Sequence, residues 1–417
     1  MTPVRRRYML ESSFQNLTAG CCLPDLLLVQ LRRFISSLTE QGYAENTLRE
    51  KVKLLAKCGE WLKRNRFTVA NLNEPLVEAF LKCRHRVHRG DSKTLQQFLD
   101  HLRRQNVVPA QNLPRDRSPL AQILNRYETH LSTERGLVAH TIQEYQSFVR
   151  KFLLERFRGQ PLLLKAVKAS DISHFILRHI PSMCGKRAQV MTTAFRSFFR
   201  FLFQKGELQA DLAASVPTVA NWQLSTVPKY LTPKEVERVL KACDRRTAIG
   251  RRNYAILLLL ARLGLRAGEV IALQLDDLNW RAGEILVRGK GLLHDRIPLP
   301  PDVGQALASY LRRDRPACGT RRVFICTKAP RRGFAHPSTL STIVRRALAR
   351  ADLRPPLKGA HLLRHSLATS MLRSGATMSE IAEILRHRAR NTTEIYAKVD
   401  FQSLQSLAHP WPMGGAQ

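Results

Sequence analysis

The chain has few acidic residues for its size. Its 417 residues include 33 Asp and Glu against 68 Lys and Arg, which gives a net charge of +35. So large an excess describes the partners of a protein more than its fold. The basic residues are spread through the periodic segments and are not confined to a tail, so basic tails or solubility alone explain them less well than a polyanionic partner. We expect that partner to be nucleic acid, in particular double-stranded DNA.

The sequence also lacks paired cysteines, metal-binding clusters and long apolar runs. Its eight cysteines include no C-x-x-C pair, and no secretory leader is recognisable, so we expect reduced thiols and a cytoplasmic location. Cys83, His85 and His88 lie close together but have no fourth ligand at zinc spacing. Apolar runs such as 256–260 are too short to span a bilayer. We therefore predict no metal, no cofactor and no membrane association.

Hydrophobic periodicity indicates a mainly α protein of several domains. Residues 1–23 are predicted to be a flexible basic leader. Residues 24–112 are predicted to be one helical module, with helical periodicity to about residue 108. A proline-containing linker follows at 108–119, and 113–226 are predicted to form a second helical domain. The two share matching segments in the same order: 42–48 resembles 136–142, and 97–102 resembles 197–202. This predicts tandem copies of one helical module, and two unrelated amphipathic bundles are the alternative.

A third domain is predicted at 227–408, followed by a tail at 409–417. Thr232, Pro233 and Glu235 combine an N-cap, a proline at the first helical position and an acid at the third, which predicts a helix start. A longer helix is expected at 254–263. Segments 284–288 and 296–299 alternate like strands on either side of a loop that contains Lys290. We predict an α+β domain with a small antiparallel sheet.

Reactive side chains concentrate between residues 361 and 396. His361 and Arg364 are three residues apart on a predicted helix, so both should leave the same polar, cationic face. Gly375 then predicts the end of that helix, and Thr377 with Glu380 forms a capping box that opens the next one.

His387 is predicted just beyond the end of that second helix. Tyr396 follows nine residues later, in the first turns of another short helix. The unsatisfied N–H groups of a helix start favour an approaching phosphate. This stretch therefore gathers two imidazoles, a guanidinium and a phenol.

The H-x-x-R-H motif, the later histidine and T-T-x-x-Y together resemble the C-terminal signature of the tyrosine recombinase (phage integrase) family. The segment 263–269, LGLRAGE, resembles the element that carries the family's first catalytic arginine. The chain departs from the family pattern at Arg386, where glycine is usual, at Leu263 in place of threonine, and at Leu292 and Leu293 in place of a second basic residue. The catalytic residues implied by the resemblance are Arg266, Lys290, His361, Arg364, His387 and the nucleophile Tyr396.

The resemblance covers residues 118–400 and implies a site-specific DNA recombinase or integrase that acts through a 3′-phosphotyrosine intermediate without metal or ATP. Residues 113–226 would be the SAM-like core-binding domain and 24–112 an extra DNA-binding copy. The implied assembly is a homo-tetramer on two DNA sites, with accessory proteins undetermined. The alternatives are a type IB topoisomerase-like relaxing activity and a catalytically idle DNA-binding protein.

Overall fold

The computed structural model describes residues 25–84, 87–110, 116, 118–220, 228–289, 294–387 and 392–399. The predicted leader, half of the predicted linker at 108–119, His85, Lys290 and the tail beyond 399 lie outside the described residues. The chain divides into two compact units, Gln111–Ser225 and the remainder, Met1–Ala110 with Thr226–Gln417. The described parts form three large hydrophobic cores, at residues 27–108, 123–216 and 231–363. The predicted boundaries at 112 and 226 stay predictions.

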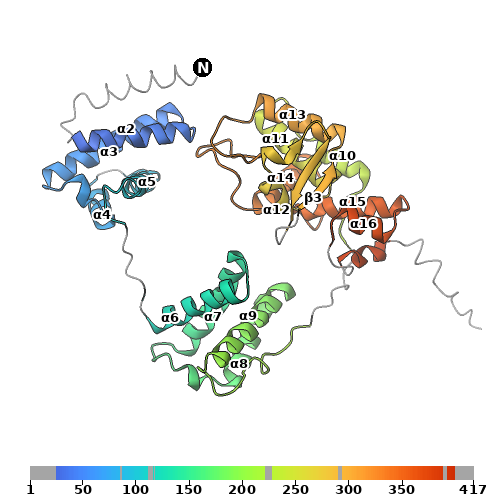
Figure 1. Ribbon diagram of the computed structural model, residues 1–417, viewed down its shortest axis with the longest axis horizontal. Helices are drawn as coiled ribbons and strands as arrows, with labels where there is room; N and C mark the ends of the chain where they lie inside the picture. Colours follow the sequence, from blue (N-terminus) through green and yellow to red (C-terminus); the bar gives the residue numbers. More distant parts are fainter. Residues whose placement is uncertain are drawn as a thin grey trace, which may run out of the picture. The chain divides into compact units, whose positions relative to one another are not determined.

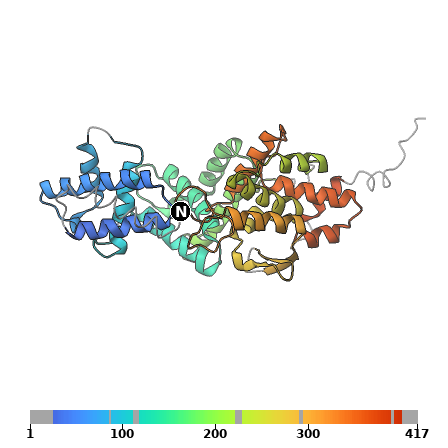
Figure 2. The same ribbon diagram turned by 90° about the horizontal axis from the view of Figure 1, so that it is seen from above.

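The first helical part consists of α2 (Asp25–Glu40), α3 (Glu45–Arg64), η1 (Val69–Asn71), α4 (Glu74–Lys82) and α5 (Asp91–Arg104). Helices α2 and α3 lie side by side in both views (Figures 1 and 2). The chain turns between them at Gly42, whose φ of +83° is a conformation that glycine adopts without a steric penalty. The apolar residues of α2, spaced at helical intervals in the sequence, are buried: Leu27, Leu31, Phe34, Ile35 and Leu38. This part is therefore helical, as the periodicity indicates.

The second helical part again has four α-helices with a 3₁₀ turn between the second and third, and it adds two short helical turns that the described residues of the first part lack. Its helices are α6 (Pro119–Thr129), the π-helical turn η2 (His130–Glu134), α7 (Ala139–Arg156), η3 (Leu164–Ala166), α8 (Ala169–His179), η4 (Ile180–Ser182) and α9 (Gly185–Gln204). Gly136, at φ +59°, occupies the turn that corresponds to Gly42. The shared order supports the prediction of two copies of one module.

Helix α9 packs an aromatic face into the core of this second part. In the sequence, the phenylalanines at 195, 198, 199, 201 and 203 occupy one broad face of a helix, which predicts core residues more than base-stacking groups. Phe195, Phe198, Phe199 and Phe201 are all buried, as this pattern predicts. The same expectation for Phe203 is wrong, because its side chain is 44% exposed. Leu202 occupies the core-facing position in that last turn and leaves Phe203 on the solvent side.

The C-terminal part is built around α11 (Ala248–Arg262), which is buried on nearly every side. Helices α10, α12, α13, α14 and α15 all pack against it. The helices of this part are α10 (Pro233–Lys241), α11, α12 (Ala267–Ala272), η5 (Leu275–Asp277), α13 (Pro301–Arg313), α14 (Ser338–Arg350), α15 (His361–Arg373), α16 (Met378–Ile384) and η7 (Glu394–Val399). The predicted capping box at Thr232 and Glu235 opens α10. Helix α11 begins before the predicted residue 254, since Thr247 caps it by accepting the Gly250 N–H.

A three-stranded antiparallel sheet completes this part, in the order β1 (Leu278–Asn279), β2 (Glu284–Arg288) and β3 (His294–Pro298). Ile285 pairs with Ile297, and Ile285 and Val287 enter the core. The predicted sheet is confirmed, with β3 starting earlier than residue 296. The fold is thus mainly helical with one small antiparallel sheet. Among the described residues, no helix has the length and apolar character needed to cross a membrane.

Candidate active site

Helix α15 carries three polar side chains of the site, those of His361, Arg364 and His365. It starts at His361 and ends at Arg373, and Gly375 follows at φ +90°, as the predicted helix stop requires. His361 is exposed, but Arg364 is 4% exposed and donates to the carbonyls of Gly264 and Leu385. The predicted cationic face is therefore exposed only at His361. The Arg364 guanidinium instead points inward, between two backbone segments.

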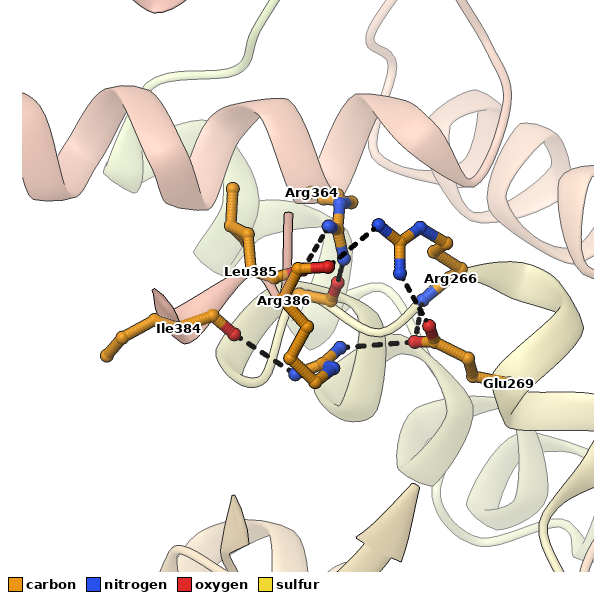
Figure 3. Close-up of polar contacts among 7 residues, drawn as sticks. Arg266, Glu269, Arg364, Ile384, Leu385 and Arg386 are labelled. Atoms are coloured by element: carbon orange, nitrogen blue, oxygen red, sulfur yellow. Dashed lines mark hydrogen bonds and ion pairs between the residues drawn. The ribbon is translucent and has the colours of Figure 1, made fainter. Parts of the chain in front are cut away.

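The glycine turn before α12 places Arg266 beside Arg364. A Cβ at Gly264 would lie 2.6 Å from the Leu385 side chain, so glycine permits the close approach of the two segments. Arg266 is the N-cap of α12, and its backbone N–H donates to Glu269 over 2.8 Å. Its side chain donates to Glu269 over 2.8 Å and to the Arg386 carbonyl over 3.2 Å (Figure 3).

The bend after α16 supplies the backbone acceptors for both arginines. Helix α16 opens with the predicted Thr377–Glu380 capping box. At its end, Arg386 N–H donates to Glu383 O over 2.9 Å and His387 N–H to Ala382 O over 2.8 Å. These two bonds define a Schellman motif, whose left-handed position is usually glycine. Arg386 occupies that position at φ +55°, so the backbone keeps the conformation that glycine favours despite the departure from the family pattern.

Tyr396 lies in η7, a 3₁₀ helix, where the sequence predicts a short helix. Its side chain is 1% exposed and packs with Ala368, Ile381 and Leu385. Its hydroxyl lies 2.8 Å from His365 Nδ1. Burial raises the pKa of Tyr396 to about 12, against the opposing charge of Arg364. In this state the phenol is a neutral, sheltered group.

The histidines around the phenol are held in their neutral forms. His387 stacks on the Tyr396 ring, with 6.4 Å between centroids, and its Nδ1 lies 2.8 Å from Thr393 Oγ1. Burial first, and then nearby positive charge, lowers the pKa of His365 and of His387 to about 4. The ring of His361 is partly desolvated although the residue as a whole is exposed, and this desolvation, with the charges of Arg364 and Arg266, lowers its pKa. All three rings are therefore able to accept hydrogen bonds near neutral pH.

Burial and the neighbouring Arg266 and Arg386 lower the pKa of Arg364 to about 10, so it stays charged at neutral pH. The structure thus connects Arg266, Arg364, His387 and Tyr396 through shared contacts. His361 joins them at the start of α15, with its ring 6.4 Å from that of His365. Lys290 lies outside the described residues.

Sequence reasoning missed two residues of this cluster as members of the site. His365 belongs to the H-x-x-R-H motif and follows His361 by one helical turn, and that spacing was the available signal. Glu269 is the acid three residues after Arg266, where a capping box places it. No sequence pattern indicated that it would also pair with Arg386.

The chain resembles known proteins along most of its length. Residues 229–403 match the phage integrase family, and 124–206 match the phage integrase N-terminal SAM-like domain. The chain belongs to the phage integrase family and is a site-specific recombinase of the tyrosine class. It is 44% identical to y4rA of Sinorhizobium fredii, provisionally named an integrase/recombinase, over 92% of this chain and 94% of that protein. It is 33% identical to tyrosine recombinase XerD of Mycobacterium tuberculosis over 70% of this chain and 98% of XerD.

Solved structures share the fold. XerH recombinase in a post-cleavage complex with palindromic difH substrate has a TM-score of 0.55 at 18% identity, over 91% of this chain and 94% of that one. A lambda integrase (75–356) dimer bound to a COC′ core site has a TM-score of 0.52 at 18% identity, over 71% of this chain and 99% of that one. At such identities the likeness concerns the fold alone.

Proposed function

We propose that this recombinase cuts and rejoins duplex DNA with Tyr396 as its nucleophile, through a 3′-phosphotyrosine intermediate that needs neither metal nor ATP. The observation that carries the proposal is the gathering of two guanidinium groups and the Tyr396 phenol around α15 and the bend after α16. Arg364 reaches the carbonyls on both sides of the site, and His365, one residue further on, contacts the phenol. Three separate segments thus converge on one small volume.

The chemistry follows from these groups. The Tyr396 oxygen attacks the scissile phosphorus, a new phosphorus–oxygen bond forms, and the 5′ oxygen leaves. The ester preserves the energy of the broken bond, so the reverse attack can reseal the strand. Arg266 and Arg364 stabilise the charge that develops on the non-bridging oxygens. Neutral His365 is placed to accept the proton that the phenol loses.

The remaining predicted residues complete the assignment. Lys290 is proposed as the general acid that protonates the leaving 5′ oxygen, and His361 and His387 as groups that hydrogen-bond the phosphate or relay protons. Cations then take the electrostatic role that a metal fills in other nucleases.

We further propose a homo-tetramer on two DNA sites, acting on DNA in the cytoplasm. The XerH and lambda integrase structures named above contain DNA, and a lambda integrase tetramer bound to a Holliday junction has a TM-score of 0.51 to this chain. Residues 113–226 would hold the duplex opposite the C-terminal domain. Residues 24–112 would add a second DNA-binding module.

The test is covalent capture on a suicide substrate nicked near the cleavage site. Tyr396→Phe removes one oxygen and keeps the ring, so it should abolish the protein–DNA adduct while DNA binding persists. An adduct at wild-type yield would move the nucleophile elsewhere, with Tyr254 and Tyr310 as matched candidates. Relaxation of plasmids of any sequence by the wild-type protein would instead favour the topoisomerase-like activity.

A further inference from the structure

Arg386 is the third arginine of the site, and it stands where the family pattern has glycine. Its side chain is 6% exposed and donates to Glu269 over 3.1 Å and to the Ile384 carbonyl over 3.0 Å (Figure 3). Its Nε has no hydrogen-bond partner among the described residues. A non-glycine residue at positive φ and a buried unpaired N–H both cost free energy. The ion pair with Glu269 is the contact that can offset them.

Glu269 is shared between two arginines of different exposure. Its carboxylate is 6% exposed and accepts from the side chains of Arg266 and Arg386 and from the Arg266 backbone N–H. The Arg386 side chain is as buried as the carboxylate, whereas that of Arg266 is 39% exposed. Arg266 can therefore turn toward a phosphate, and Arg386 cannot follow it without leaving the interior.

The movement of Arg266 would be costly if it were the only partner of Glu269. A buried carboxylate without a cation is strongly unfavourable, so Glu269 would hold Arg266 back from the DNA. Burial acts to raise the pKa of Glu269, but the Arg266 N–H and the charges of Arg386 and Arg266 keep it below its usual range. Arg386 is thus part of what keeps this carboxylate ionised.

We propose that Arg386 is a positioning residue that keeps Glu269 paired while Arg266 transfers its guanidinium to the scissile phosphate. The proposal rests on the assignment of Arg266 as a phosphate ligand. In the DNA-free protein Glu269 has two cationic partners, and in the DNA complex it retains one. Arg386 acts through Glu269 and Arg266 and does not itself contact the substrate.

The sharing of Glu269 is tested first without DNA, by thermal denaturation of the full chain carrying Arg266→Ala, Arg386→Met or both. Methionine retains an unbranched apolar stem and removes the charge. Each single variant leaves Glu269 one cation, so each should lower Tm only slightly, and the double variant should lose clearly more than the sum. The excess should vanish in a Glu269→Gln background. Additive losses of Tm would show that Glu269 is not shared between the two arginines. That conclusion does not depend on any cleavage assay.

The role in catalysis is tested by single-turnover cleavage of the nicked substrate. Arg386→Met should slow cleavage roughly 10- to 100-fold, with a much smaller change in the Kd for DNA, because Glu269 then has Arg266 as its remaining cation and retains it. Adding Glu269→Gln to Arg386→Met should recover part of the rate, and Arg386→Lys should retain more activity than Arg386→Met.

A purely structural role predicts a different pattern. Cleavage, DNA binding and Tm would then fall together, and Glu269→Gln would recover nothing. Arg386→Gly is the control for misfolding of the bend, because glycine adopts the positive φ without strain and also lacks the charge. If Arg386→Gly cleaved DNA at the wild-type rate, the proposal would be wrong. Failure of the Tyr396→Phe test would remove the proposed nucleophile and leave the denaturation result intact.

Discussion

The core of the second helical part and the site around α15 are both buried, but they are stabilised by opposite means. Around α9 the interior consists of phenylalanine rings, such as Phe199 against Phe152 at 5.9 Å between centroids. Around α15 the interior contains Glu269 and Arg364, ions whose burial is unfavourable unless each has a partner. The first region therefore stabilises the fold. In the second region, the surrounding fold keeps otherwise unfavourable buried charges in place for chemistry.

The largest effect is expected in the aromatic core. Phe199→Ala should lower the free energy of unfolding by about 3–5 kcal/mol, because it leaves a cavity among fully buried rings. Phe203→Ala, on the same helix but 44% exposed, is the matched control and should change it by less than about 1 kcal/mol. Denaturant unfolding of both variants measures the difference. Equal losses would mean that α9 does not bury the face described.

The next effect concerns the charged site. Arg364→Ala should slow single-turnover cleavage by roughly 100- to 1000-fold, as removal of a preorganised charge-stabilising group commonly does. Arg373→Ala, at the exposed end of α15, should leave the rate nearly unchanged. The rate loss should exceed what the fraction of unfolded protein explains, which a parallel melting curve checks. If unfolding explained it fully, Arg364 would be a structural residue like those of the aromatic core.

The smallest effect is the dependence of stability on pH that the histidines of the charged site should produce and the phenylalanine core should not. His365 and His387 have folded pKa values of about 4, below the value of about 6.5 in an unfolded chain. Between these values the unfolded chain binds more protons, so the free energy of unfolding should fall as pH decreases from about 6.5 toward 4. We expect each of the two histidines to contribute a loss of about 1–2 kcal/mol between about pH 7 and 5, measured by denaturant unfolding. His365→Gln and His387→Gln should each flatten the curve, and an unchanged slope in both would contradict the assignment.

Local signals in the sequence were sufficient for much of the fold. The capping boxes at Thr232 and Thr377, the stop at Gly375 and the alternation of β2 all depend on neighbouring residues, so they could be predicted directly. Helix α11 begins earlier than expected because its cap, Thr247, precedes its apolar run.

The site was predictable as a set of residue types in order, and not as a set of contacts. Spacing indicated that His361 and Arg364 share a helix. The approach of Gly264 to Leu385 joins segments far apart in the chain, and no local pattern encodes it. The pairing of Glu269 with Arg386 is equally long-range, so the departure from glycine at 386 could be noticed but not explained.

The contacts that hold Arg364 determine which substitutions such a site can accept during evolution. Its guanidinium is bound by the carbonyls of Gly264 and Leu385, groups that every amino acid carries. A substitution at residue 385 can change the side chain without removing the acceptor, provided that the backbone path is kept. Covariation across homologous sequences should therefore reveal no side-chain partner for Arg364. Glu269 and Arg386, in contrast, should change together, since each depends on the charge of the other.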